Sequence, residues 1–516
     1  MPTSIGRSRI LSGLDATVSP ADAAARSRPT SLAWRRQTWL HAALTVLDIV
    51  GNALCCSLVA WAITWLSAIG NPFVGQSPAA QSYRTFALST FISSQLFYCA
   101  IGTGIQAAML RSLHFRDAPE RCATLWRCVW RVWRRASPFY LVSLVLLLGV
   151  EFALSTPSLR HLRPYRLDVY LGWSTCFVYT VGLGLVGRFV FKNETVEGQR
   201  SVVQVLRAMP AQAPPAMLVA GKTASFWSAW RRVVVVRVPI FAVGLGTVLY
   251  VHVLSSQRFD DEVKLVGLIM GSVFLKHLVQ RLAKRFMLQT DVKSIRTMVI
   301  AVGPPTVLID TQLRVILQRV DDTHITMRGA ALMALLELAI RLVKARHTRH
   351  ILLEAQAASV GGTTARALAL ASTSTATQTN KHLYVTRLLA FRAAALVADM
   401  SAEYIAMGCA SAILFFYWNH DKYQLAETST TPVPHSASAT NRWDASQTLV
   451  FVAQAVVEIV VDVFSCSVEV SHGVTFDVVR QDRVYVALVF IATAIGSVIV
   501  TATTYLRAPP SSSSSP

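Results

Sequence analysis

The chain has 516 residues, of which 53% are hydrophobic and only 15% are charged, and its formal net charge is +21. The charged share lies well below the roughly 25% of a soluble globular domain, which argues against a soluble protein. Lys and Arg occur between long apolar runs rather than on a soluble basic domain, so we expect anionic lipid headgroups, and no nucleic acid, as their partner.

Long apolar runs predict an all-α, polytopic bundle of transmembrane helices. A helix that crosses the bilayer needs about 20 predominantly apolar residues. Nine runs approach this length: 44–69, 85–110, 137–155, 168–190, 238–255, 263–280, 393–418, 446–468 and 484–506. The run 263–280 is the weakest, because Lys264 and Lys276 must both reach toward the interfaces if it spans.

Composition divides the chain into six expected segments. These are a basic, disordered N-terminal segment at 1–43, six spans in 44–280, a block of amphipathic helices on the cytoplasmic face at 281–358, a low-complexity linker at 359–381, three spans in 382–506 and a disordered tail at 507–516. The linker is rich in Gly, Ala, Ser and Thr and has little capacity to bury a core. We expect neither the linker nor the tail to fold.

The distribution of Lys and Arg predicts the orientation. Segments 1–40, 111–137, 192–237 and 281–392 hold 36 of the 49 Lys and Arg residues, whereas the alternating loops hold seven. Short cationic loops stay on the cytoplasmic side of a membrane. We therefore expect an integral, multi-pass protein with a cytoplasmic N terminus, in the plasma membrane or an endomembrane.

An aromatic and basic segment precedes the third span. Its indoles share one helical face and its guanidiniums occupy the rest: Trp126, Trp130 and Trp133 against Arg127, Arg131, Arg134 and Arg135. Such a pattern is typical of a helix that lies in the headgroup layer. We expect these seven side chains to contact anionic lipid headgroups.

The expected cytoplasmic block begins with an apolar stretch, 297–309, that is too short to span. Pro304 and Pro305 remove two backbone donors and should interrupt a helix there. Further on, a second amphipathic pattern sets apolar positions against charged ones: Met333, Leu336, Ile340 and Val343 against Glu337, Arg341 and Lys344. We expect this helix to rest on membrane or protein, and a cytosolic partner could bind within 281–392.

Carboxylates inside apolar helices are the best candidates for a functional site. Asp399 and Glu403 stand four residues apart in one span, and Glu458 and Asp462 do so in the next, so each pair shares a helical face. An ionised acid at bilayer depth costs about 2.5–3.5 kcal/mol and needs a partner or water. Helix rise brings Glu403 and Asp462 to a similar depth. The four acids predict a cation or proton site, with a hard cation favoured over zinc because no His or Cys pair lies nearby.

A structural role for the same acids is the alternative. In that case each acid is matched by a nearby cation or hydroxyl, with Arg387 or Arg392 pairing Asp399 and Glu403, and Arg188 or hydroxyls meeting Glu458 and Asp462. In the outer loop, His420 and Asp421 could bind a metal or sense acid pH, although a loop histidine is the simpler interpretation.

Two functions are compatible with this pattern. The first is a carrier or channel-like protein for a cation or a proton-coupled solute. The second is a membrane scaffold or sensor that binds lipid and cytosolic partners through basic inner-face helices. The sequence contains no GxSxG, HExxH or Walker motif, so we expect neither catalytic residues nor a cofactor.

Three stretches of the C-terminal half carry a resemblance. They are GPPTVLIDTQLR from Gly303 to Arg314, ADMSAEY from Ala398 to Tyr404, and Val460-Val461-Asp462. They resemble a group of polytopic membrane proteins from oomycetes that carries no assigned activity. The resemblance implies a eukaryotic membrane protein and says nothing of substrate or of functional residues.

Overall fold

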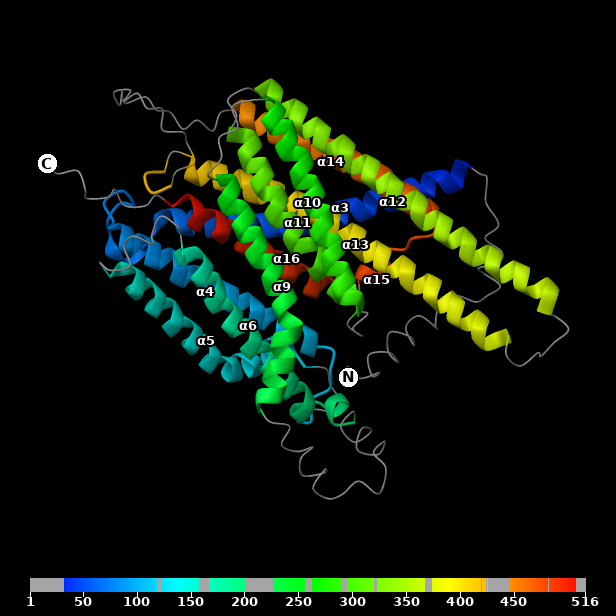
Figure 1. Ribbon diagram of the computed structural model, residues 1–516, viewed down its shortest axis with the longest axis horizontal. Helices are drawn as coiled ribbons and strands as arrows, with labels where there is room; N and C mark the ends of the chain where they lie inside the picture. The colour runs from blue at the N-terminus through cyan, green and yellow to red at the C-terminus, as the bar shows by residue number, and fades with distance from the viewer. Residues whose placement is uncertain are drawn as a thin grey trace, which may run out of the picture.

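The computed structural model describes residues 32–117, 123–156, 167–200, 226–255, 262–289, 295–319, 323–366, 374–418, 420–423, 425, 445–480 and 482–506. Within these ranges the regular structure is helical, and two isolated bridges join Phe115 to Thr195 and Tyr423 to Leu506. The expected all-α, multi-pass bundle is confirmed (Figure 1). Most of the predicted N-terminal segment 1–43 and all of the predicted tail 507–516 lie outside the described residues.

The long helices run back and forth along one common direction (Figure 1). Their bounds are α3 (Leu32–Ile69), α4 (Tyr83–Leu110), α5 (Leu125–Ser155), α6 (Leu167–Glu194), α9 (Phe226–Ser255), α10 (Glu262–Gln289), α11 (Ile295–Arg319), α12 (Thr323–Arg366), α13 (Ser374–Tyr417), α14 (Ala445–Ser471) and α16 (Arg483–Tyr505). Two short helices, η1 (Pro72–Val74) and α15 (Asp477–Arg480), lie in connections.

Nine described helices are long and apolar enough to cross a membrane: α3, α4, α5, α6, α10, α11, α13, α14 and α16. The number equals the expected one, but the set differs. Met298–Arg319 in α11 joins it, whereas the predicted span 238–255 falls in α9, whose apolar stretch Gly244–Leu254 is shorter. The candidate spans of the described structure therefore differ from the predicted ones at α9 and α11.

Helix α11 contradicts the expected cytoplasmic-face block at 281–358. It continues through Pro304 and Pro305 without interruption and lies in the centre of the bundle, where it packs most extensively against α13 and also against α10 and α16. Its polar residues Asp310, Gln312 and Arg314 face protein and are buried. Proline and charge are tolerated at membrane depth where neighbouring helices surround them, which the run-length criterion does not count.

Helix α12 buries charged residues of its expected amphipathic pattern. Glu337 and Arg341 are buried in the bundle together with Met333 of the expected apolar face, whereas Leu335 and Val343 are each 65% exposed. The physical reason is that lipid, unlike water, is a good solvent for the apolar face of a helix, whereas its charged side chains need partners inside the protein. The expected linker also shrinks, because α12 continues to Arg366 and α13 begins at Ser374.

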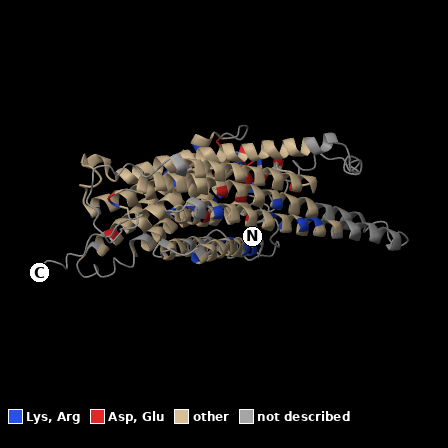
Figure 2. Cartoon of the chain, turned by 90° about the horizontal axis from the view of Figure 1, so that it is seen from above, with Lys and Arg blue, Asp and Glu red and all other residues tan. Residues whose placement is uncertain are grey.

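The core that positions the site is formed by α3, α11, α13 and α16, with α10, α12 and α14 on one flank and α4, α5 and α6 on the other (Figure 1). Figure 2 shows charged residues along the middle of the helices as well as at their ends. The buried charged residues lie on α10, α12 and α14, and on the neighbouring core helices α11 and α13.

Candidate functional site

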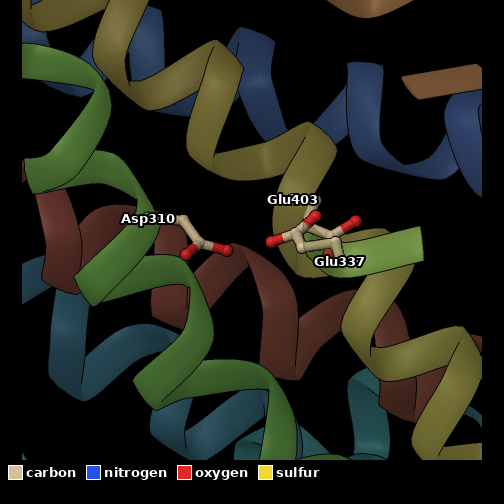
Figure 3. Close-up of side chains that lie close together, drawn as sticks. All are labelled: Asp310, Glu337 and Glu403. Atoms are coloured by element: carbon tan, nitrogen blue, oxygen red, sulfur yellow. The ribbon is translucent and has the colours of Figure 1, made fainter. Parts of the chain in front are cut away.

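Three carboxylates from three helices surround one lysine in the bundle. Asp310 on α11, Glu337 on α12 and Glu403 on α13 point toward one another, as Figure 3 shows, and their closest oxygens all lie within 4.8 Å of one another. We call these three residues the carboxylate cage. Lys276 on α10 donates hydrogen bonds of 2.8 Å to Asp310 Oδ2, 2.8 Å to Glu337 Oε1 and 3.1 Å to Glu403 Oε1.

Lys276 does not lie where the sequence predicts it. Lys276 does not reach toward an interface but turns into the bundle, where its side chain is 1% exposed. Lys276 lies 14 residues after the start of α10, Glu337 lies 14 residues after the start of α12, and Glu403 lies 14 residues before the end of α13. Helix α10 begins, α12 begins and α13 ends at the same end of the bundle, so at 1.5 Å per residue all three side chains lie about 21 Å from it. The cage is thus well inside the membrane-spanning part.

Arginines on α11 and α12 extend the cage to helix α14. The Arg341 guanidinium donates to Glu403 Oε2 on α13 and to Asp462 Oδ1 on α14. The Arg314 guanidinium donates to Glu458 Oε1 on α14, one turn from Asp462. One connected network of ion pairs therefore links α10, α11, α12, α13 and α14.

Asp399 is held by a neutral partner instead. Gln280 on α10 donates from Nε2 to Asp399 Oδ1 at 2.8 Å and to Thr306 Oγ1 at 2.9 Å. Lys344, half-buried on α12, lies close enough to act electrostatically on Asp399 and contacts His277 Nδ1 at 3.4 Å. Asp399 thus sits at the edge of the network.

All four acids predicted from the sequence are buried, and Arg341 holds Glu403 and Asp462 at the same depth. Of the partners expected for a structural role, Arg392 binds another acid, and a hydroxyl, that of Tyr404, faces Asp462. The side chain of Arg387 lies outside the described residues. Arg392 pairs with Glu469, and the cations that meet the four acids come from α10, α11 and α12.

Five members of the network escaped the sequence analysis: Lys276, Asp310, Arg314, Glu337 and Arg341. Four of them lie in the block 281–358, which was expected outside the bilayer, and Lys276 lies in a predicted span but was expected to reach toward an interface. A signal was present, however, because Asp310 and Arg314 are four residues apart, as are Glu337 and Arg341. This spacing repeats that of the two predicted acid pairs.

Carboxylates outnumber cations in this network. Six buried acids face three buried cations: Asp310, Glu337, Asp399, Glu403, Glu458 and Asp462 against Lys276, Arg314 and Arg341. Counting the half-buried Lys344 still leaves two acids in surplus. An ionised surplus in a low-dielectric interior is unfavourable unless protons or a further cation neutralise it.

No protein-family model, no curated protein and no solved structure matches the chain. The resemblance to the oomycete group stays a prediction. The role of the network is therefore inferred from its own chemistry.

The predicted headgroup helix is not a separate element in the structure. Its residues form the first turns of α5, which continues without a break into the span. Trp126 and Trp130 are 76% and 58% exposed, and Arg127 and Arg134 are also exposed. Trp133 is half-buried and packs on Tyr140.

Two guanidiniums of this segment bind protein rather than an open surface. Arg131 pairs with Asp117 and with Glu194, and Arg135 pairs with Glu194. The Arg131 contact holds the pKa of the Asp117 carboxyl below its usual value. Lipid contact through the other members stays a prediction.

Both ring nitrogens of the loop histidine His420 are hydrogen-bonded. His420 Nε2 donates to the Ala68 carbonyl at 2.8 Å, and the Lys422 backbone N–H donates to Nδ1 at 3.1 Å. Burial lowers the pKa of His420 below its usual 6.5. Because both ring nitrogens are used, a metal could bind His420 only by breaking one of these bonds.

Proposed function

We propose that the chain is a carrier or channel-like protein for a cation or a proton-coupled solute, and that the interior network is its coupling site. The observation that supports the proposal is the carboxylate surplus. A protein that needs charges only for packing gains most from balanced pairs, since each uncompensated buried charge is costly. A site that takes up and releases positive charge needs acids in excess.

The position of the network supports coupling to movement. Lys276 and Arg341 each bind acids on more than one helix, so neither side chain can change partners without disturbing several helices. Neutralising one acid weakens the attraction that holds these helices together. Loading a proton or a cation would thereby shift the relative stability of two helix arrangements, which is the requirement for coupled transport.

The test is flux in proteoliposomes under an imposed pH gradient or membrane potential. We expect Glu458→Gln combined with Asp462→Asn to lower flux at least about tenfold, because two acids of the site become neutral amides. The matched control is Asp48→Asn, an acid outside the network that pairs with Arg483 at a partly exposed position. Unchanged flux in the double variant would show that the site is wrong.

A scaffold or sensor is the second candidate, favoured by the exposed indoles of Trp126 and Trp130. In this case a cytosolic partner would bind the end of α12 and the beginning of α13, which extend beyond the other helices (Figure 1), because α11 and the charged face of α12 are buried in the bundle. Absence of flux for every cation tested, with retained binding to anionic vesicles, would favour this candidate.

A further inference from the structure

The carboxylate cage has the geometry of an ammonium receptor. An ammonium group carries three N–H donors and no acceptor, and Lys276 places one donor on each of the three acids at 2.8, 2.8 and 3.1 Å. Three tetrahedral hydrogen bonds of that length end about 4.6 Å apart, and the closest cage oxygens lie within 4.8 Å of one another. The spacing of the acids therefore suits this group.

The surroundings favour a monovalent cation over a divalent metal. Ca²⁺ takes six to eight oxygen ligands at 2.3–2.6 Å, and Mg²⁺ requires a near-octahedral shell. The cage offers three closely placed carboxylates, and the second oxygen of Glu403 is bound by the Arg341 guanidinium. A dication next to Glu403 would be repelled by that guanidinium.

Two buried polar atoms beside the cage, the Tyr404 hydroxyl and Asp462 Oδ2, make no close hydrogen bond in the described structure; their residues are 6% and 1% exposed. The Tyr404 hydroxyl faces the Asp462 carboxylate and also lies near Glu403 and Glu458. Buried polar groups gain from well-formed hydrogen bonds, which polar atoms of a ligand would supply here.

We propose that the carboxylate cage binds the primary ammonium group of an organic cation, and that Lys276 is a tethered competitor that fills the cage in the absence of this ligand. The proposal rests on the proposed carrier function and names the class of its cargo. The incoming ammonium takes over the three acceptors of Lys276, while Tyr404 and Asp462 bind further polar atoms of the cargo.

The exchange keeps one ammonium in the cage at every step. An empty cage would leave three carboxylates close together in the bundle, which is strongly unfavourable. When Lys276 leaves as the ligand arrives, one ammonium replaces another and this state is avoided. The flexible four-carbon stem of lysine allows its charge to move without a change in the helix that carries it.

The first experiment is chemical rescue of Lys276→Ala in the purified full-length chain. Alanine keeps Cβ and removes the other three carbons and the ammonium, and n-butylammonium supplies an ammonium of the same size on a chain one carbon longer than the part removed. We expect the variant to unfold at a lower temperature than the wild type, and millimolar n-butylammonium to raise that temperature in a saturable way. The matched control, n-butyltrimethylammonium, has the same charge and chain but no N–H donor. An equal shift with both ions, or none with either, would overturn the proposal.

The second experiment begins with the wild-type chain, whose uptake does not depend on the folding of any variant. We expect proteoliposomes to take up n-butylammonium saturably, above the uptake of protein-free liposomes, and Glu337→Gln to reduce this uptake at least tenfold. Equal uptake with and without protein contradicts the proposal.

The two proposals fail in different ways. If network-dependent flux of protons or another cation is observed while n-butylammonium neither rescues Lys276→Ala nor is carried, the ammonium site is wrong and the carrier function stands. If rescue is specific but no flux of any kind occurs, the site stands and the carrier function is wrong.

Discussion

Removing Arg341 tests how strongly the interior network holds the fold. Arg341→Met keeps much of the side-chain volume but leaves Glu403 and Asp462 without the cation that both of them bind. Breaking a buried ion pair from one side costs about 3–5 kcal/mol, and here one cation serves two acids. We expect the free energy of unfolding to fall by at least this amount at neutral pH, and by less at acidic pH, where the two acids take up protons.

The assay is equilibrium unfolding in detergent micelles, with two reference variants. Arg483→Met removes a cation that is 63% exposed and pairs with Asp48, and such pairs contribute about 0–1 kcal/mol. Adding Glu403→Gln and Asp462→Asn to Arg341→Met removes the orphaned charges and should restore about half of the loss, since contacting residues couple. If Arg341→Met costs no more than Arg483→Met, the interior charges do not support the fold as argued.

Two further predictions concern the loop and the packing. The lowered pKa of His420 means that the folded chain resists its protonation, so stability is complete above about pH 6.5 and falls as the pH drops below it; thermal unfolding across this range should show less pH dependence in His420→Gln than in the wild type. Gly408→Ala should destabilise the fold by about 1–3 kcal/mol, because its Cβ would lie only 2.4 Å from Ser57 Cβ. Gly51→Ala, where no atom lies within 4 Å, is the control, and equal unfolding temperatures of these two variants would contradict the packing argument.

The sequence predicts the bundle well wherever a helix is long and mostly apolar. Runs such as 484–506 and 446–468 correspond to α16 and α14 within a few residues. Counting uncharged runs misses α11, because each charge interrupts a run whatever its neighbour in the fold. Asp310 and Glu337 enter the bundle since Lys276 meets them there, and that contact joins residues 34 and 61 positions apart.

The sequence predicts the four acids of the candidate site but not the other residues of the network. The four acids on α13 and α14 stand out because their surroundings are apolar, and the helix rise relates Glu403 to Asp462. Their cations could not be assigned by the same reasoning, because they lie in segments whose polar composition indicated water. A pattern of acid and base four residues apart, as in Glu337 and Arg341, is equally typical of a solvent-exposed helix.

Helices α11 and α12 follow one another in the chain, which has a topological consequence. Two consecutive helices that both cross add two crossings, and two that both stay on one side add none. In either case the chain before α11 and the chain after α12 are on the same side of the membrane. Consistently, the end of α16 reaches Tyr423, which bonds the Ser67 carbonyl near the end of α3. The first and last helices thus end at the same face of the bundle. The orientation predicted from the charge pattern is therefore the same whether the chain crosses the membrane nine or eleven times.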